Sequence, residues 1–160
     1  MTIYVLRHGV AEERRAGSPD ATRALTAAGK QKLRAVLRLA KEAGVTPDII
    51  LTSPLTRALE TAEMAAEILG CRKKPAVTKA LLPSSSPGGV WKEIAGTKMS
   101  SVLIAGHEPL LSHVISFLLN CTALQIDLKK SALVRVDMIS SEPQASGTLK
   151  WMLTTKLAGS

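Results

Sequence analysis

The chain alternates between short apolar runs and longer stretches in which apolar residues recur at helical spacing. The short runs are rich in Ile, Val and Leu, which is typical of strands that are buried on both faces of a sheet. Strands of this kind are expected at residues 2–6, 48–52 and 101–105. Their alternation with helices predicts an α/β fold in which these strands are parallel.

Helices are expected between and after these strands. The first covers residues 26–43, with Thr26 as a suitable N-cap and Gly44 as a suitable end. Its apolar residues share one face at amphipathic spacing: Leu33, Val36, Leu37 and Ala40. Further helices are expected at 54–69, at about 90–95 and at about 109–120.

The last part of the chain follows a different pattern. From residue 132 to 139 apolar residues alternate with Arg135 and Asp137, which predicts a half-exposed strand. A loop at 140–147 leads to a last strand at 149–155, so the two strands form a hairpin; a short strand is also expected at 76–78. We therefore expect one domain, residues 1–160, built as a three-layer α/β/α sandwich with a mostly parallel central sheet.

The formal net charge of +8 raises the question of nucleic-acid binding. The Lys and Arg residues are scattered along the chain without a long basic block, and the chain holds only 2 Trp, 1 Tyr and 1 Phe to stack on bases. A solvated basic surface that attracts acidic or phosphorylated partners explains this charge better. We expect no nucleic-acid partner.

Membrane association and disulfide bonding are not expected either. No window approaches the roughly 18 apolar residues that a membrane span needs, and Arg7 interrupts the first apolar run too early for a signal peptide. Cys71 and Cys121 are far apart and lack the spacing of a metal site. We expect a cytoplasmic protein.

Three expected strands end in residues that suit the binding of an anion. The strand ends are Arg7-His8-Gly9, Ser53-Pro54 with Arg57 shortly after, and Gly106-His107-Glu108-Pro109. Because the carboxyl ends of parallel strands meet at one edge of a sheet, we expect these residues to converge. Pro54 and Pro109 are suited to the first position of a helix, whose N-terminus favours anions. The sequence predicts a phosphate pocket.

These motifs resemble those of the histidine phosphatase superfamily, the phosphoglycerate-mutase-like proteins that form a phosphohistidine intermediate. The likeness rests on residues 6–9, 52–58 with 61–63, and 106–109. The short chain, Arg23-Ala24-Leu25-Thr26 and Leu128-Lys129-Lys130-Ser131-Ala132 are further similar to the SixA-type phosphohistidine phosphatases. The resemblance implies a phosphoglycerate-mutase-like fold.

The resemblance also implies roles for the residues of the pocket. His8 would be the nucleophile, and Arg7, Arg57 and His107 would bind phosphate oxygens. Further phosphate contacts are expected from Arg23, Ser53 and Gly9, although Arg23 also fits a surface position in a loop. Cationic neighbours are expected to lower the pKa of His8 and keep it neutral. The resemblance implies a reaction in two displacements that requires no metal and no cofactor. His113 is expected on the surface.

The general acid is where the chain departs from the superfamily. Many members place Glu or Asp after the middle strand, whereas the loop at 83–87 here carries only serines between prolines. Glu12, Glu93 and Glu108 are the candidates, and a site without any general acid is the alternative. A phosphohistidine suits such a site, because imidazole leaves more easily than an alkoxide. No segment long enough to form a lid subdomain follows the helix at 54–69, so an open site is expected.

The leading hypothesis is a phosphatase that acts on protein phosphohistidine, with a phosphorylated histidine-containing phosphotransfer domain as partner. One alternative is a phosphomonoesterase of the same superfamily that acts on a small phosphorylated substrate. Another is a catalytically silent module that binds phosphate or phosphoproteins. A mutase is disfavoured, because both the acid and the lid are missing.

Overall fold

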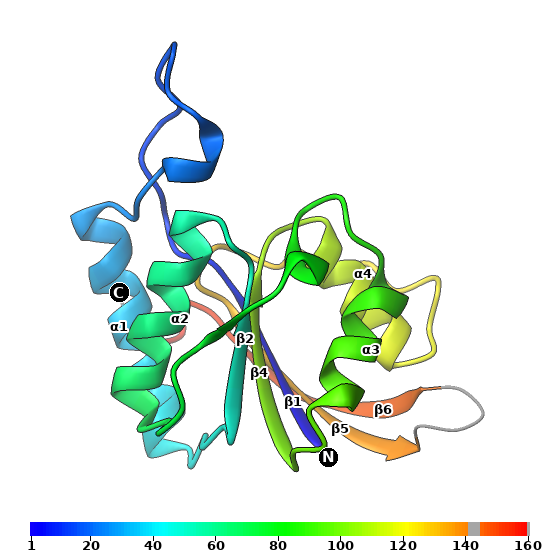
Figure 1. Cartoon of the computed structure of the whole chain (residues 1–160). Helices are drawn as coiled ribbons and strands as arrows, with labels where there is room; N and C mark the ends of the chain where they lie inside the picture. Colours follow the sequence, from blue (N-terminus) through cyan, green and yellow to red (C-terminus); the bar gives the residue numbers. More distant parts are fainter. Residues whose placement is uncertain (141–144, 160) are drawn as a thin grey trace.

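A mixed six-stranded sheet forms the centre of the protein. The structure, a computed structural model, describes residues 1–140 and 145–159 (Figure 1). The strand order is β3-β2-β4-β1-β5-β6. The four strands from β3 to β1 are parallel to their neighbours: β1 (Thr2–Arg7), β2 (Ile49–Thr52), β3 (Ala76–Val77) and β4 (Ser101–Gly106). The last two form an antiparallel hairpin beside β1: β5 (Leu133–Ser140) and β6 (Ser146–Leu153).

Helices cover both faces of this sheet. On one face lie α1 (Ala27–Glu42) and α2 (Thr56–Leu69), and on the other lie α3 (Pro87–Gly96) and α4 (Leu110–Leu118) (Figure 1). Two short 3₁₀ turns, η1 (Asp20–Thr22) and η2 (Lys79–Leu81), lie in the connections. This is the expected α/β/α sandwich, with the parallel strands first and the hairpin last.

The central strand β1 explains the near-continuous apolar runs of the sequence. Ile3 and Val5 pack into the core beneath α3 and α4, whereas Tyr4 and Leu6 pack into the core beneath α1 and α2. All four side chains are buried, because successive residues of a strand point to opposite faces and here both faces are covered.

The expected helix starts at two prolines are wrong. Helix α2 begins at Thr56 with Leu55 as its N-cap, and α4 begins at Leu110 with Pro109 in the N-cap position. After β2 the chain first makes a turn in which the Leu55 N–H donates to the Ser53 hydroxyl, so Pro54 lies before the helix. The proline at the first position of a helix is instead Pro87 of α3.

The end of the chain differs slightly from expectation. Strands β5 and β6 extend into the predicted loop at 140–147, of which residues 141–144 lie outside the described residues. Strand β6 ends at Leu153 rather than 155, and the chain then turns so that Ala158 packs against the core beneath α1 and α2.

The start of α1 holds the chain that leaves β1. Thr26 caps this helix as predicted: its hydroxyl accepts from the Gly29 N–H at 2.9 Å. The Thr26 N–H in turn donates to the Val10 carbonyl at 2.9 Å. A Cβ on Gly29 would lie 2.2 Å from that same carbonyl oxygen, so only glycine allows this close approach.

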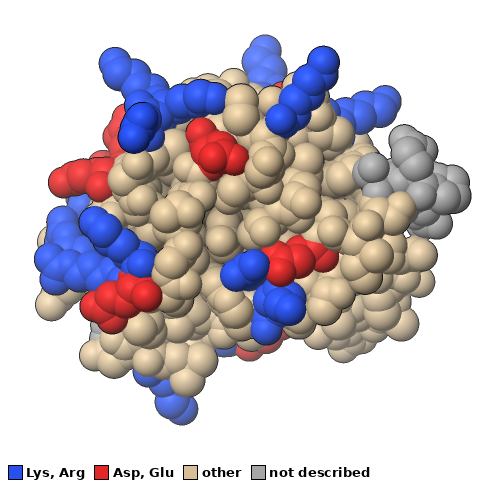
Figure 2. All heavy atoms as spheres, turned by 90° about the horizontal axis from the view of Figure 1, so that it is seen from below, with Lys and Arg blue, Asp and Glu red and all other residues tan. Residues whose placement is uncertain are grey.

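Charge on the face at the amino ends of the parallel strands is distributed rather than concentrated (Figure 2). Figure 2 shows the face at the amino ends of the parallel strands, where Lys and Arg side chains stand in separate groups with Asp and Glu among them. None of the helices in the described part of the chain is long and apolar enough to span a membrane.

Candidate active site

The three expected strand ends meet at one edge of the sheet. Strands β2, β4 and β1 are neighbours in that order, so the residues that follow them lie side by side. The backbone joins them directly: the His8 N–H donates to the Gly106 carbonyl at 3.0 Å, and the Ser53 N–H donates to the Ala105 carbonyl at 3.1 Å. Parallel pairing therefore places His8, Ser53 and His107 together.

His8 is buried with one ring nitrogen fixed as a donor. Its Nδ1 lies 2.7 Å from the Gly9 carbonyl oxygen. A carbonyl oxygen only accepts, so the proton is on Nδ1 and the lone pair is on Nε2. The Gly9 N–H donates to the Thr61 hydroxyl at 3.2 Å. Both polar groups of Gly9 are therefore used to hold the chain around His8, rather than left open toward a ligand.

His107 lies beside His8 and is held by Ser53. The two imidazole centroids are 5.0 Å apart, with an angle of 54° between the ring planes. Nε2 of His107 lies 2.9 Å from the Ser53 hydroxyl oxygen, whereas Nδ1 has no hydrogen-bond partner. Ser53, predicted to contact phosphate, lies beside His107 at these strand ends, and its hydroxyl contacts that imidazole.

Both histidines are neutral at physiological pH. Burial and, to a smaller extent, the charges of Arg57, Arg7 and Lys130 together lower the pKa of His8 to about 4, while the bond to Gly9 opposes them. Burial also lowers the pKa of His107 to about 3, with His8, Arg57 and Arg7 adding to the effect. The cationic neighbours predicted from the sequence contribute, but burial is the larger cause.

Each of the two arginines predicted to bind phosphate, Arg7 and Arg57, has a buried N–H group without a hydrogen-bond partner. Arg7 donates from Nη1 to the Leu128 carbonyl at 2.7 Å. Among the buried side-chain nitrogens of the described residues that lack a partner are Arg7 Nε, Arg57 Nε and His107 Nδ1. Buried polar groups are normally paired. Two unpaired arginine N–H groups and one unpaired imidazole nitrogen in one small site fit an anion that binds there.

Arg57 is buried; Thr61 bonds to its backbone and Asp20 bonds to its side chain. Its backbone carbonyl accepts from the Thr61 hydroxyl at 2.7 Å, and the same hydroxyl accepts from the Gly9 N–H. Thr61 thus connects α2 to the chain that carries His8, a role that the sequence signals only by a polar residue one turn after Arg57. Burial lowers the pKa of Arg57 from its ordinary value, and Asp20 opposes this effect.

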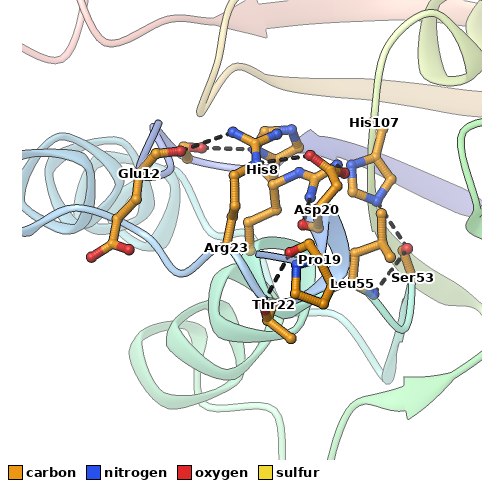
Figure 3. Close-up of polar contacts among 11 residues, drawn as sticks. His8, Glu12, Pro19, Asp20, Thr22, Arg23, Ser53, Leu55 and His107 are labelled. Atoms are coloured by element: carbon orange, nitrogen blue, oxygen red, sulfur yellow. Dashed lines mark hydrogen bonds and ion pairs between the residues drawn. The ribbon is translucent and has the colours of Figure 1, made fainter. Parts of the chain in front are cut away.

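Asp20 is the site residue that the sequence did not single out. Its carboxylate accepts from Arg57 Nη2 at 3.2 Å and from Arg23 Nε at 2.8 Å (Figure 3). Its carbonyl accepts from Arg57 Nη1 at 3.1 Å. Arg23, half-buried, also donates to the Glu12 carbonyl at 2.9 Å. The signal in the sequence was an Asp three residues before Arg23, in a loop that otherwise reads only as polar.

Of the three glutamates considered as general acids, one is bonded to Ser112 of α4 and two are exposed. The Glu108 carboxylate accepts from the N–H and the hydroxyl of Ser112 in the first turn of α4. The Glu12 side chain is exposed and points away from the site in Figure 3. Glu93 is exposed on α3. His113 is exposed on α4, as predicted.

Residues 3–82 match the family model of the histidine phosphatase superfamily (branch 1). The chain belongs to this superfamily. A protein of Picosynechococcus sp. described as uncharacterised is 33% identical to it over 144 residues, which cover 84% of this chain and 83% of the relative. Membership in the superfamily supports a phosphatase, a hydrolase of phosphorylated compounds.

Solved structures place the chain within the superfamily. It is similar to the protein histidine phosphatase SixA in complex with tungstate, with a TM-score of 0.85, 26% identity and 98% of each chain covered. It also resembles the putative phosphohistidine phosphatase SixA from Agrobacterium tumefaciens, with a TM-score of 0.82, 22% identity and coverage of 96% and 97%. The chain is thus of the SixA type.

The same fold also occurs in a phosphatase of a different kind. The mycobacterial glucosyl-3-phosphoglycerate phosphatase in complex with VO3 has a TM-score of 0.73 to this chain at 15% identity, with 94% and 97% of the chains covered. At this identity the likeness concerns the fold alone.

Proposed function

We propose that this protein is a phosphohistidine phosphatase that removes the phosphoryl group from a phosphorylated histidine of another protein. The observation that carries the proposal is the fixed tautomer of His8, whose Nε2 lone pair is available beside the unpaired donors of Arg7, Arg57 and His107. A neutral imidazole that is surrounded by cationic donors suits nucleophilic attack on a phosphoryl group.

The reaction has two displacements. In the first, the Nε2 lone pair of His8 bonds to phosphorus, the P–N bond of the substrate breaks, and its electron pair returns to the substrate imidazole. Arg7, Arg57 and His107 stabilise the charge on the phosphoryl oxygens. In the second, water attacks the phosphorus on His8 and releases inorganic phosphate and a proton, which restores the neutral imidazole. The chemistry requires no metal and no cofactor.

The surroundings of the predicted acids support a phosphohistidine substrate. Glu108 is engaged with Ser112, and Glu12 and Glu93 are exposed. An alkoxide leaving group needs a proton from an acid, whereas an imidazole leaves as a neutral molecule. A phosphotransfer domain with a phosphorylated histidine is therefore the proposed partner. Such a substrate implies a cytoplasmic role in signal transduction.

A small phosphorylated substrate is the second candidate. It is favoured by the shared fold of the glucosyl-3-phosphoglycerate phosphatase, which by its name acts on a small molecule. Incubation with phosphorylated histidine-containing domains and with sugar phosphates, followed by measurement of released phosphate, separates the two candidates. Faster release from the sugar phosphates would favour the small substrate. Binding of vanadate without any turnover would instead indicate the silent module.

The role of His8 is tested by trapping the intermediate. We expect rapid quenching of the reaction to yield acid-labile phosphate on His8, and the His8→Ala variant to lose turnover. Acid-labile phosphate on a different residue would contradict the proposed mechanism. The exposed histidine variant His113→Ala serves as the matched control and should keep full activity.

A further inference from the structure

The carboxylate of Asp20 lies at the proposed phosphate site and has no role in the two displacements described above. It lies in the short turn η1, within the loop that connects β1 to α1. Its two carboxylate oxygens are bonded to different arginines, one to Arg23 and the other to Arg57. It also lies close enough to His107 for its charge to raise the pKa of that imidazole. An acidic group beside a site for an anion calls for a physical explanation.

The Asp20 carboxylate is held in its ionised form. Partial burial raises the pKa of Asp20, but the hydrogen bond from Arg23 and the charge of Arg57 outweigh this effect and leave the pKa below its ordinary value. An ionised carboxylate has no proton to donate, so Asp20 is not a general acid for an alkoxide. It has lone pairs that accept a hydrogen bond instead.

Asp20 lies on the outer side of the site. His8 is 7% exposed, whereas the Asp20 side chain is 40% exposed. Attacking and leaving atoms lie in line on opposite sides of phosphorus. Attack from the buried His8 therefore sends the leaving group outward, toward the solvent side on which Asp20 lies.

Resting on the proposed function, we infer that Asp20 selects the leaving group. Its carboxylate accepts the N–H of the departing substrate imidazole and so favours phosphoramidates whose nitrogen leaving group carries its own proton. A phosphoester brings no such N–H and meets a negative charge where its alkoxide develops.

The step is balanced without an external acid. The substrate imidazole is protonated on the nitrogen that does not bear phosphorus, and this N–H donates to Asp20. As the His8–phosphorus bond forms, the P–N bond breaks, and its electron pair stays on the second nitrogen. The leaving group departs as neutral imidazole, with its original proton still in place.

The test compares two substrates in three proteins. We measure kcat/KM for N-phosphoimidazole and for p-nitrophenyl phosphate in the unmodified protein, in Asp20→Asn and in Glu13→Gln. Glu13 is an exposed carboxylate of the same loop, so its variant removes the same charge without touching the site. The kcat/KM for N-phosphoimidazole divided by that for p-nitrophenyl phosphate should fall by about 10-fold to 100-fold in Asp20→Asn, the size of one hydrogen bond to a charged group. In Glu13→Gln this ratio should stay constant.

Two outcomes would overturn the inference. If Asp20 only holds Arg57 and Arg23 in place, Asp20→Asn lowers kcat/KM for both substrates by the same factor and the ratio stays constant. A fall of the ratio in Glu13→Gln equal to that in Asp20→Asn would show a general effect of charge. Both results leave the proposed function standing, which fails separately if the unmodified protein does not hydrolyse phosphohistidine or N-phosphoimidazole. Asp20→Ala, checked by circular dichroism, provides a second variant with the same expected fall.

Discussion

The Ser53 hydroxyl lies 2.9 Å from Nε2 of His107 and also accepts the Leu55 N–H at 3.3 Å. This contact joins the end of β2 to the end of β4. The phosphate contact proposed for His107 requires the Ser53 hydroxyl to donate to Nε2, because the single proton of neutral His107 is then on Nδ1, which has no other partner. In the proposed site Ser53 thereby directs Nδ1 of His107, as a donor, toward the phosphoryl oxygen.

Removal of this hydroxyl should weaken phosphate binding. Ser53→Ala leaves the buried Nε2 of His107 unpaired, which costs about 1–3 kcal/mol. We expect kcat/KM for a phosphohistidine protein to fall by about 10-fold to 100-fold and the inhibition constant of vanadate to rise. Ser84→Ala, in the exposed serine loop before α3, is the control and should change neither value. Equal kinetics in both variants would contradict this role of Ser53.

The geometry of Arg57 should matter as well as its charge. Arg57 uses two nitrogens on Asp20 and keeps Nε free, which a lysine cannot reproduce with its single ammonium. We expect Arg57→Lys to lower kcat/KM by about 100-fold or more, as loss of a charge-stabilising donor does. Steady-state kinetics measure this effect. The control Arg34→Lys, on the exposed face of α1, should keep full activity; retained activity in Arg57→Lys would show that charge alone suffices.

The buried histidines should make the protein less stable in acid. His8 and His107 have pKa values of about 4 and about 3 when folded, against about 6.5 when unfolded. Below pH 6.5 the unfolded chain therefore binds protons that the folded protein does not, so the free energy of unfolding falls as the pH falls. At pH 5 each histidine lowers it by about 2 kcal/mol relative to pH 7.

Urea denaturation at pH 7 and at pH 5 measures this dependence. We expect the His107→Asn variant to lose about half of the dependence that the two histidines cause, because one of the two titrating groups is gone. The same difference between pH 7 and pH 5 in the variant and in the unmodified protein would contradict the assignment.

Gly29 should be irreplaceable for packing. A Cβ there would lie 2.2 Å from the Val10 carbonyl oxygen, which is backbone and cannot move aside without shifting the chain after His8. We expect Gly29→Ala to lower the free energy of unfolding by about 1–3 kcal/mol or more, as overpacking does, and to reduce activity. Thermal denaturation reports the first effect.

Gly96→Ala provides the matched control for Gly29. Gly96 is the last residue of α3, and nothing lies within 4 Å of a Cβ added there. Its replacement should leave the stability unchanged or raise it slightly, because alanine favours the helix. Equal stability of the two alanine variants would contradict the steric interpretation.

Local patterns were sufficient to predict most of the fold. The apolar runs predicted β1, β2 and β4, the cap at Thr26 marks the start of α1, and the helix expected at 54–69 ends at residue 69, as α2 does. These features depend on neighbours in the chain, so the sequence shows them. The predicted starts of α2 and α4 were wrong. At α2 the chain first makes the turn in which the Leu55 N–H donates to the Ser53 hydroxyl, a contact that spacing does not reveal.

The sequence by itself determined which residues converge: two histidines and two arginines follow the ends of parallel strands. The order of strands and helices places these strand ends at one edge of the sheet. The tertiary structure decided what each group does there. Asp20 meets Arg57 across 37 positions of the chain, and Ser53 meets His107 across 54. Burial, which sets the pKa of both histidines, arises only when both faces of the sheet are covered. Such contacts join distant segments, and no local pattern encodes them.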